Sequence, residues 1–573
     1  MKNLRAFLWI GLAAILFVDF QVWQMDYAPR DAAAAAAAQK AVEADKVTHP
    51  LTAEVPQAGA AKANTAAPAA GTPATAANGA APAATAKTEL APGATLNVRT
   101  DVLDVDVNLR GGELTRADLL QYPIVKGGAE PVHLLRNHGE GDRYLVQTGL
   151  AGPGGAAPAD YPTHLALFTS DYTGFRLEPG LDELRVPLKW TSPTGVEVTK
   201  TLIFRRGAYR VDVEYAVKNG SAAPWSAAPY AQIEHDMPLV KRSYFNVDSY
   251  SFVGPAYWDG SKYEKLRITS DKDAAFNGEF RDGWIASLQH HFVVAIVPPR
   301  DRLQDYSLHV RGNEYLATDV GQTVTVAPGA TDTLHQTLFV GPKLQHQLEA
   351  IHPELGRAAD FGKLTFLARP LFWLLEQAHK VFGNWGFAIM AVTFLLKLAF
   401  YPLSEIAGRS AAKMKLIAPR MKQLQEQYKD DRARLGQATM ELYKKEKINP
   451  ATGCLPMLIQ IPVFMAFYWV LLESVEMRQA PFIGWIHDLS SRDPLFILPA
   501  IMAGAMFLQY KMQPPSADPT QAKIFMIMPF VMSFTFAFFP AGLVLYWVTN
   551  TLLTIAQQWN INRRIQAATA ARN

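Results

Sequence analysis

The feature that most constrains this chain is a series of five apolar stretches, each 16–19 residues long, near its C-terminal end. Because backbone N–H and C=O groups cannot stay unpaired in a lipid core, such stretches are expected to fold as membrane helices. They are at the short end for a bilayer core of about 30 Å, which indicates interlocking helices or a locally thinned membrane. The predicted spans are Trp385–Leu403, Cys454–Leu472, Leu495–Tyr510, Ile524–Phe539 and Gly542–Gln557.

The N-terminus carries a further apolar run with the features of an anchor. Lys2 and Arg5 precede a run from Ala6 to Val18, which continues into the bulky and polar segment Asp19–Trp23 instead of an A-x-A cleavage site. Residues 1–24 are therefore predicted to form an uncleaved transmembrane signal anchor with its basic end in the cytoplasm.

Two different kinds of sequence separate this anchor from the spans. Residues 25–93 are rich in Ala, Pro, Thr and Gly and offer few large apolar side chains to bury, so a disordered linker is expected. Residues 94–342 carry short stretches such as Val211–Val217, in which every second residue is apolar. The segment Val198–Phe204, followed by Arg205–Gly207, predicts a hairpin with that stretch. The pattern as a whole is typical of an antiparallel, all-β sandwich domain.

The distribution of charge predicts how these parts are oriented. Residues 404–450 contain eleven Lys and Arg against six Asp and Glu, so this loop is expected in the cytoplasm. The loop 476–494 has only two basic residues and is therefore expected on the outer side of the membrane. Residues 559–573 are expected to form a basic cytoplasmic tail. Counting spans places both termini in the cytoplasm and the β-domain outside. The net charge of +3 gives no argument for nucleic-acid recognition.

The loop 404–450 has a helical pattern of its own. A turn at Lys429–Asp431 separates two amphipathic stretches, so we expect a helical hairpin, kinked near Pro419. The first stretch has its apolar seam at Met414, Ile417, Met421, Leu424 and Tyr428, and the second at Leu435, Ala438 and Leu442. The basic residues Arg420, Lys422 and Lys429 are typical of an arm that docks a ribosome or a nascent chain. They fit equally a charged, solvated hairpin that only orients the protein, and both alternatives stay open.

Residues 343–384 connect the β-domain to the spans. The end of this segment is amphipathic but too short and too polar to cross a bilayer, so an interfacial helix is expected. Its apolar stripe comprises Leu364, Leu367, Leu371, Phe372 and Leu375.

Motifs of enzyme chemistry are missing from the sequence. It contains no G-x-x-x-x-G-K-[ST], no H-E-x-x-H and no G-x-S-x-G. The pair His290-His291 adjoins a strand-like run, where neighbouring side chains are expected to point to opposite faces, so no metal site is predicted. Cys454 is the only cysteine, which excludes an intramolecular disulfide. Neither an enzyme nor a cofactor is expected.

The most informative single residue is Lys397, which lies within the first predicted span of the C-terminal series. A charged side chain near a helix centre costs roughly 2.5–3.5 kcal/mol on insertion scales and usually faces a bundle interior or a water-filled cavity. The alternative is snorkelling, because Ser404 is only seven residues away, about 10 Å at helical rise.

Polar residues on neighbouring spans favour the cavity. Thr393 lies one turn from Lys397, and Gln460 lies between two prolines on the next span. The last span carries a polar stripe at Tyr546, Asn550, Thr554 and Gln557, with Trp547 beside it. A shared hydrated cavity open toward the cytoplasm would satisfy all of them, although hydrogen bonds between helices without a cavity would do so too.

Several segments resemble the Gram-negative members of the YidC/Oxa/Alb family of membrane protein insertases, over nearly the whole chain. The segments that carry the resemblance are Tyr401–Leu403, Leu442–Pro450, Gly453–Pro462, Val475–Phe482, Trp485–Ser490 and Pro540–Tyr546, with a looser match at Val198–Thr201 and Gly283–Ala286.

The resemblance implies an N-terminal anchor, a periplasmic β-supersandwich and a five-helix insertase core over residues 385–558, in a bacterial inner membrane. It implies a hydrophilic groove whose single positive residue falls on Lys397, where family members often have arginine, so the bidentate fork is lost. Thr393, Gln460, Tyr546, Trp547 and Asn550 are expected in that groove, and Met528, Met532, Phe464 and Tyr468 along an apolar substrate slide. The implied partners are nascent inner-membrane proteins, the Sec translocon with its accessory subunits, the ribosome and the lipid bilayer.

Two other classes of function remain open from the residues alone. A transporter or channel would use the buried lysine to bind an anion, but inverted repeats are not visible in the sequence. A tethered sugar-binding module or carbohydrate-active enzyme would place the function in residues 94–342, where no obvious pair of carboxylates is found.

Overall fold

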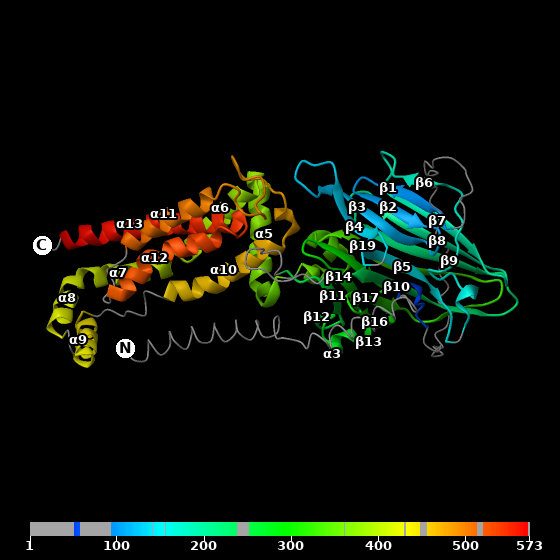
Figure 1. Ribbon diagram of the computed structural model, residues 1–573, viewed down its shortest axis with the longest axis horizontal. Helices are drawn as coiled ribbons and strands as arrows, with labels where there is room; N and C mark the ends of the chain where they lie inside the picture. Colours follow the sequence, from blue (N-terminus) through cyan, green and yellow to red (C-terminus); the bar gives the residue numbers. More distant parts are fainter. Residues whose placement is uncertain are drawn as a thin grey trace. The chain divides into compact units, whose positions relative to one another are not determined.

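The computed structural model describes residues 51–57, 93–139, 141–154, 156–237, 251–359, 361–428, 431–446, 455–512 and 519–570. These divide into two compact units, which we call the β-unit (described residues up to Ala359) and the helical unit (from Phe361 onward) (Figure 1). The predicted anchor, Cys454 and Lys429 lie outside the described residues, as does most of the predicted linker.

The β-unit contains two large sheets, as the alternating sequence predicts. In β9 (Arg210–Asn219) the side chains of Val211, Val213, Tyr215 and Val217 are fully buried, and the residues between them are half-buried. One sheet has eight strands, in the order β12-β11-β14-β15-β19-β9-β8-β7. Its other members are β7 (Glu183–Thr191), β8 (Val196–Arg205), β11 (Gly254–Trp258), β12 (Tyr263–Lys265), β14 (Trp284–Leu288), β15 (Phe292–Val297) and β19 (Thr331–Pro342).

The second sheet has eleven strands, in the order β13-β16-β17-β10-β5-β4-β3-β2-β1-β6, with β18 beside β10. Among the described strands of both sheets, only β1 and β6 pair in parallel. The strands are β1 (Thr95–Arg99), β2 (Leu103–Asn108), β3 (Glu113–Pro123), β4 (Pro131–Asn137), β5 (Arg143–Ala151), β6 (Gly174–Arg176), β10 (Trp225–Asp236), β13 (Asn277–Arg281), β16 (Leu303–Arg311), β17 (Glu314–Val320) and β18 (Val324–Val326).

The predicted hairpin is formed by β8 and β9, which pair antiparallel from Phe204 with Val211 to Val196 with Asn219. The chain reverses at Gly207, whose φ of +67° suits a residue without a side chain. The pair His290-His291 was expected on opposite faces of a strand, and this is wrong. Both residues lie in the turn between β14 and β15, with their rings stacked 3.8 Å apart, because the turn releases them from the alternation of a strand.

One lysine lies inside the β-unit. The side chain of Lys200, on β8, is fully buried, and its Nζ donates to the carbonyl oxygens of Gly111 at 2.7 Å, Gly112 at 3.0 Å and Thr148 at 3.0 Å. The rings of Phe168 and Tyr215 also lie within 6 Å of the ammonium. The three donors of the ammonium group are thus all used, and they tie the eight-stranded sheet to the other sheet.

Part of the predicted linker packs on the β-unit. Leu51 is only 3% exposed, the carbonyl oxygen of Glu54 accepts from Gln232 at 3.3 Å, and its carboxylate pairs with His309 at 2.6 Å. A disordered linker throughout residues 25–93 is therefore wrong for residues 51–57. This segment differs from the Ala- and Pro-rich sequence around it because Leu51 and Glu54 supply an apolar anchor and a charge.

Between the strands and the long helices, α4 (Gln345–Ile351) and the 3-10 turn Pro353–Ala358 pack on the core of the β-unit through Leu348 and Leu355. The helical unit begins with α5 (Thr365–Phe382), which ends at Gly383 with φ +63°. Of the predicted apolar stripe, Leu371, Phe372 and Leu375 are buried and Leu364 and Leu367 half-buried. The opposite side exposes other large apolar residues: Phe366, Trp373, Val381 and Phe382.

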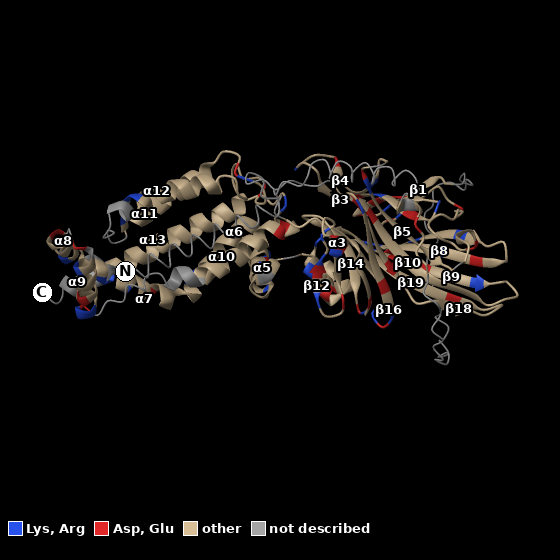
Figure 2. Cartoon of the chain, turned by 60° about the horizontal axis from the view of Figure 1, so that its bottom comes forward, with Lys and Arg blue, Asp and Glu red and all other residues tan. Residues whose placement is uncertain are grey.

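The predicted spans correspond to long, mostly uncharged helices, which Figure 2 shows almost without coloured residues. They are α6 (Trp385–Ala399), α10 (Leu455–Glu473), α11 (Ile497–Met512), α12 (Pro519–Phe536) and α13 (Ala541–Ala570). α7 (Tyr401–Leu416) follows α6 and lies mostly in the charged loop 404–450. No single helix in the described ranges is both long enough and apolar enough to cross a membrane. The helices Trp385–Ala399 and Tyr401–Ser410, which meet at a bend of 64°, reach that length and hydropathy only when taken together.

Several boundaries differ from the prediction, such as the start of α12 at Pro519 rather than Ile524, and two of the differences have a local cause. The helix expected over Trp385–Leu403 breaks at Phe400, because Pro402 cannot continue α6 but fits the first turn of α7. The helix expected to end at Gln557 continues to Ala570, since nothing in the polar tail interrupts it.

The predicted hairpin after the bend is present. α7 leads into α8 (Ala418–Gln427), with Pro419 in the first turn of α8, and α9 (Arg432–Lys445) returns along α8. Asp431 caps α9 by accepting from the amides of Ala433 and Arg434. Charged residues are concentrated on these helices (Figure 2).

Candidate functional site

The side chains predicted to form a groove come from three helices of the helical unit, α6, α10 and α13. α6 begins at Asn384, whose side chain accepts from the amides of Gly386 and Phe387, and it buries Ala388, Ile389, Val392 and Thr393. That buried face packs on α13, while α7 and α10 approach the same region. Polar residues one turn further along α6 and α13 are thereby brought to a common place.

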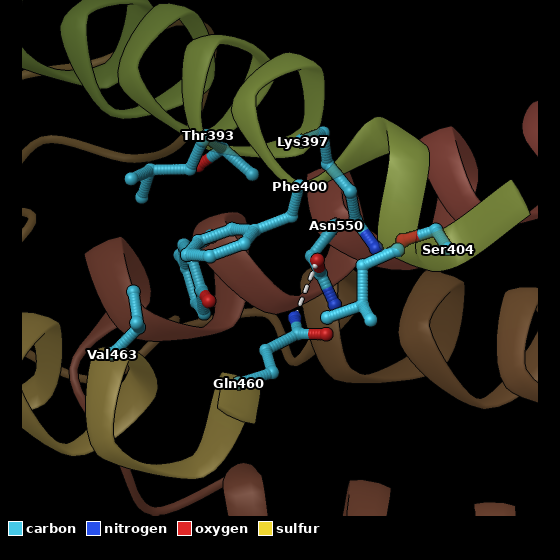
Figure 3. Close-up of a pocket in the computed structure, with 10 residues that line it drawn as sticks. Thr393, Lys397, Phe400, Ser404, Gln460, Val463 and Asn550 are labelled. Atoms are coloured by element: carbon cyan, nitrogen blue, oxygen red, sulfur yellow. Dashed lines mark hydrogen bonds between the residues drawn. The ribbon is translucent and has the colours of Figure 1, made fainter. Parts of the chain in front are cut away.

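A small recess lies between these helices (Figure 3). Its volume is about 30 Å³, enough for roughly one or two water molecules. A small recess therefore lies where the shared cavity was expected, and its hydration stays a prediction. It is lined by Thr393, Leu396, Lys397, Phe400, Leu403, Ser404, Gln460, Val463, Tyr546 and Asn550.

Lys397 lies in the last turn of α6, because the helix ends at Ala399 rather than continuing to Leu403. Its side chain is half-buried, and its Nζ donates to Thr554 Oγ1 on α13 at 2.8 Å. No carboxylate of the described residues forms an ion pair with it. The ammonium is therefore directed at the neighbouring helix and carries a charge without a counter-charge.

The other polar side chains of the recess bond to one another or to the backbone. Gln460 Nε2, on α10, donates to Asn550 Oδ1 on α13 at 2.8 Å, which Figure 3 marks with a dashed line. Thr554 Oγ1 donates to the carbonyl oxygen of Asn550 at 2.7 Å, and Thr393 Oγ1 donates to that of Ile389 at 2.6 Å. Hydrogen bonds between helices therefore line the edge of a recess.

The aromatic pair of α13 is divided between two environments. Tyr546 is 2% exposed and lines the recess, with its ring stacked 4.7 Å from that of Phe467. Trp547 contacts Phe464 at 4.8 Å and Phe536 at 5.4 Å and does not line the recess. The structure thus brings together five of the six predicted groove residues, and Trp547 is placed outside because consecutive residues of a helix point about 100° apart.

The residues predicted as a substrate slide lie next to this aromatic group. Phe464 joins it directly, and Tyr468, one turn further along α10, is 6.1 Å from Phe539. Met528 is 41% exposed and Met532 half-buried on α12, on which many large apolar residues are exposed. These exposed residues are Ile524, Phe525, Met526, Ile527, Met528, Phe530, Val531 and Phe534.

The basic residues of the hairpin are described in part. Arg420 on α8 forms an ion pair at 2.6 Å with Glu446, which follows α9, and this pair joins the two helices of the hairpin. Lys422 lies on α8, but its side chain is not among those described, and Lys429 lies outside the described residues. Across the described ranges, no three His, Cys, Asp or Glu side chains lie close enough together to hold a metal ion.

Sequence reasoning omitted some residues of the recess. Phe400, Leu403 and Ser404 belong to it because the bend at Phe400 turns α7 back across the end of α6. Pro402 was the available signal for this bend. Thr554 was recognised as part of a polar stripe, but its direct bond to Lys397 depends on the crossing of α6 and α13, which no spacing within one helix predicts.

Comparison with protein families assigns both units. The family described as "60Kd inner membrane protein" matches residues 377–568, and the family described as "YidC periplasmic domain" matches residues 95–374. Together these matches span nearly everything from the first strand to the end of α13.

Curated relatives match the chain from end to end. A protein of Thioalkalivibrio sulfidiphilus is 45% identical over 576 residues, with 99% of both chains covered, and one of Azotobacter vinelandii is 41% identical over 574 residues; both are named "Membrane protein insertase YidC". A solved structure described as an active YidC insertase covers 83% of this chain and 94% of its own at 18% identity, with a TM-score of 0.37.

Proposed function

Because the chain belongs to the YidC family of membrane protein insertases, and is an insertase rather than an enzyme, we propose that the recess around Lys397 receives the polar end of a substrate protein. Membership of this family also sets aside the transporter and carbohydrate-enzyme alternatives. What remains to be assigned is which residues perform the insertion.

The physical difficulty of insertion lies in the polar tail of the substrate. An apolar substrate helix gains some 0.3–0.6 kcal/mol per residue on entering lipid, which is ample over about 20 residues. The tail, in contrast, must cross hydrocarbon that offers no hydrogen bonds. A polar recess partway through the membrane shortens that path, and a cation within it attracts an acidic tail. The membrane potential adds about 2.3 kcal/mol per negative charge for each 100 mV crossed outward, so no nucleotide is needed.

The observation that carries this proposal is that the ammonium of Lys397 points to a neighbouring helix and has no counter-charge beside it. Its ammonium bonds to Thr554 at 2.8 Å and has no carboxylate partner in the described part of the chain. A lysine that only snorkelled would extend toward the lipid headgroups instead. One of its three N–H donors is used by Thr554, so the remaining donors are available to a carboxylate or a carbonyl group of the substrate.

Lysine in place of arginine has a defined consequence in this proposal. An ammonium is a compact point charge that attracts acidic groups without the two parallel hydrogen bonds of a guanidinium. We therefore expect the site to favour acidic tails in general over one particular carboxylate geometry.

The substrates of an insertase are nascent membrane proteins, and it acts at the lipid bilayer of the inner membrane. We propose the finer arrangement as well: both termini and the α8–α9 hairpin in the cytoplasm, and the β-unit in the periplasm. The basic loop 404–450 supports this orientation. The Sec translocon and the ribosome are the proposed partners, the latter through exposed basic residues such as Arg420.

The experiment is depletion of the protein and complementation with charge variants, with insertion of a short-tailed substrate as the readout. Lys397→Glu is expected to lower insertion of an acidic-tailed substrate at least about tenfold, because an attraction becomes a repulsion. The matched control is Lys413→Glu, which reverses an exposed lysine on α7 and is expected to leave insertion unchanged.

A reciprocal substrate makes the experiment sharper. If charge in the recess governs insertion, a substrate whose acidic tail residues are replaced by lysines should lose less activity with Lys397→Glu than the original substrate does. Full insertion of the acidic substrate by Lys397→Glu, at normal protein levels, would contradict the proposal. Crosslinking from Gln460 or Met528 to a stalled nascent chain separately tests the path along α10 and α12.

A further inference from the structure

A second cavity lies in the β-unit, away from the helices that carry insertion. It opens between the two sheets, where β10, β16 and β17 of the larger sheet face β19 of the smaller one, and its volume is about 200 Å³. Three polar side chains line it from inside the sandwich: Gln304, Asp319 and Gln336. Each is 4% exposed or less.

Two of these side chains have no partner among the described residues. Both carboxyl oxygens of Asp319, which is 1% exposed, lack a hydrogen bond, and so do the oxygen and nitrogen of the Gln336 amide. A buried polar group left unpaired costs about 1–3 kcal/mol, so proteins retain few of them without water or a ligand to pair with.

The strand pattern makes their position unusual. On β19, Gln336 occupies an inward position between Leu334 and Leu338, both of which are buried and apolar. On β17, Asp319 faces inward beside Tyr306 of β16, its partner across the sheet. Apolar side chains would close this end of the sandwich, whereas these residues keep a polar space open.

We propose that this cavity is a binding site for a small, neutral, polyhydroxylated molecule, held by hydrogen bonds from Asp319 and Gln336. The volume corresponds to roughly six or seven water-sized groups, which suits a molecule between glycerol and a hexose in size. Hydroxyl groups both donate and accept, and they match a carboxyl group and carboxamides better than a purely anionic or purely cationic ligand does. Pro298 and Pro299 supply an apolar wall for the carbon skeleton.

Charge around the cavity supports a neutral ligand. Burial raises the pKa of Asp319 well above its usual range, and the nearby Asp305 raises it further, which favours the neutral carboxyl group over the carboxylate. At the rim, Arg302 and Asp301 carry opposite charges. With one charge of each sign at the rim, neither an anion nor a cation is favoured over a neutral polyol.

The test uses the full-length protein in lipid nanodiscs, because detergents with sugar headgroups would themselves occupy such a site. D-Glucose and glycerol are titrated as probes, with putrescine as a cationic counter-probe, and binding is followed by saturation-transfer NMR. We expect saturable binding of at least one polyol, weakened at least about tenfold by Asp319→Leu and by Gln336→Leu. Asp332→Leu, which changes an exposed aspartate at the start of β19 that does not line the cavity, is the matched control and should bind within about twofold of the unaltered protein.

Folding of the variants is checked by hydrogen exchange in β17 and β19. Removal of an unpaired buried polar group is expected to leave protection unchanged or increased. Absence of saturable binding, equal binding by the unaltered protein and both leucine variants, or tighter binding of putrescine than of either polyol would overturn the proposal. In the first two cases the cavity holds water only.

Discussion

Each unit of this protein contains a lysine in a place where lysine is costly, and the two are treated differently. In the β-unit, Lys200 is fully buried and its ammonium donates to three backbone carbonyl oxygens within 3.0 Å. In the helical unit, Lys397 is half-buried, bonds to one hydroxyl group and lines a recess. The first lysine is saturated by the fold, and the second keeps unused hydrogen-bonding capacity.

This difference separates a structural lysine from the one that we propose to act in insertion. Burial lowers the pKa of Lys200 to about 7, and the nearby Glu113 opposes that shift. The cost of burying Lys200 is offset by contacts that join two sheets, and no donor is left for a ligand. Lys397 joins α6 to α13 by a single bond, so its removal should disturb function more than folding.

The largest expected effect is on the stability of the β-unit. Lys200→Met removes the donor shared by three buried carbonyl groups and leaves Glu113 without its neighbouring cation, so we expect a loss of about 3 kcal/mol. Hydrogen exchange of the β8 and β9 amides measures it. Lys218→Met, which alters an exposed lysine paired with Glu197, is the control and should change stability by less than about 0.5 kcal/mol. Equal protection in both variants would remove the distinction between the two lysines.

The next effect is on insertion, with little change in stability. Lys397→Met keeps the length of the side chain but removes the charge, and we expect insertion of an acidic-tailed substrate to fall about tenfold, equivalent to about 1.4 kcal/mol. Hydrogen exchange in α6 and α13 should change little, because only one bond between helices is lost. The prediction fails if Lys397→Met unfolds the helical unit and Lys397→Arg restores neither folding nor insertion. Lys397 would then be structural, like Lys200.

A smaller effect is expected at the hydroxyl group that holds Lys397. Thr554→Val removes the acceptor of the 2.8 Å bond while keeping the shape of the side chain. The ammonium is then free to turn toward substrate or solvent, and we expect insertion to change by no more than about threefold, or about 0.7 kcal/mol. Thr549→Val, on the same helix but bonded only to the carbonyl oxygen of Leu545, is the control. A loss as large as that from Lys397→Met would mean that the bond itself, rather than the charge, sustains function.

The sequence predicted most of the fold because periodicity reports burial directly. The alternation in Val211–Val217 and the apolar stripe at Leu371–Leu375 describe side chains that contact one core, and both were found as expected. Five of the six residues predicted for the groove line the recess, since polar residues are conspicuous in apolar helices.

What could not be predicted depends on contacts between distant segments. The bond from Lys397 to Thr554 joins residues 157 positions apart, and the cavity at Asp319 and Gln336 requires two sheets to face each other. The packing of residues 51–57 on the β-unit was missed for the same reason, because Leu51 and Glu54 find their partners only after the strands have assembled.

The smallest effect concerns pH and the segment 51–57, which was predicted to be disordered. The bond to Glu54 raises the pKa of His309 above 6.5, and the bond to His309 holds that of Glu54 below 4.5. The charged pair therefore stabilises docking fully between about pH 4.5 and 6.5; this contribution is lost as pH rises through the pKa of His309 or falls through that of Glu54.

Both partners are more than a third exposed, so solvent screening limits the pair to about 0.5 kcal/mol. Hydrogen exchange of the Glu54 amide, which donates to the carbonyl oxygen of Leu51, should accordingly show slightly more protection at pH 6 than at pH 8.5 after correction for intrinsic rates. Glu54→Gln should remove this difference and leave the remaining protection, because Leu51 still packs on the β-unit. A pH dependence that persists in Glu54→Gln would assign the effect to another group, and the docked segment would then be held by apolar burial and the bond from Gln232 alone.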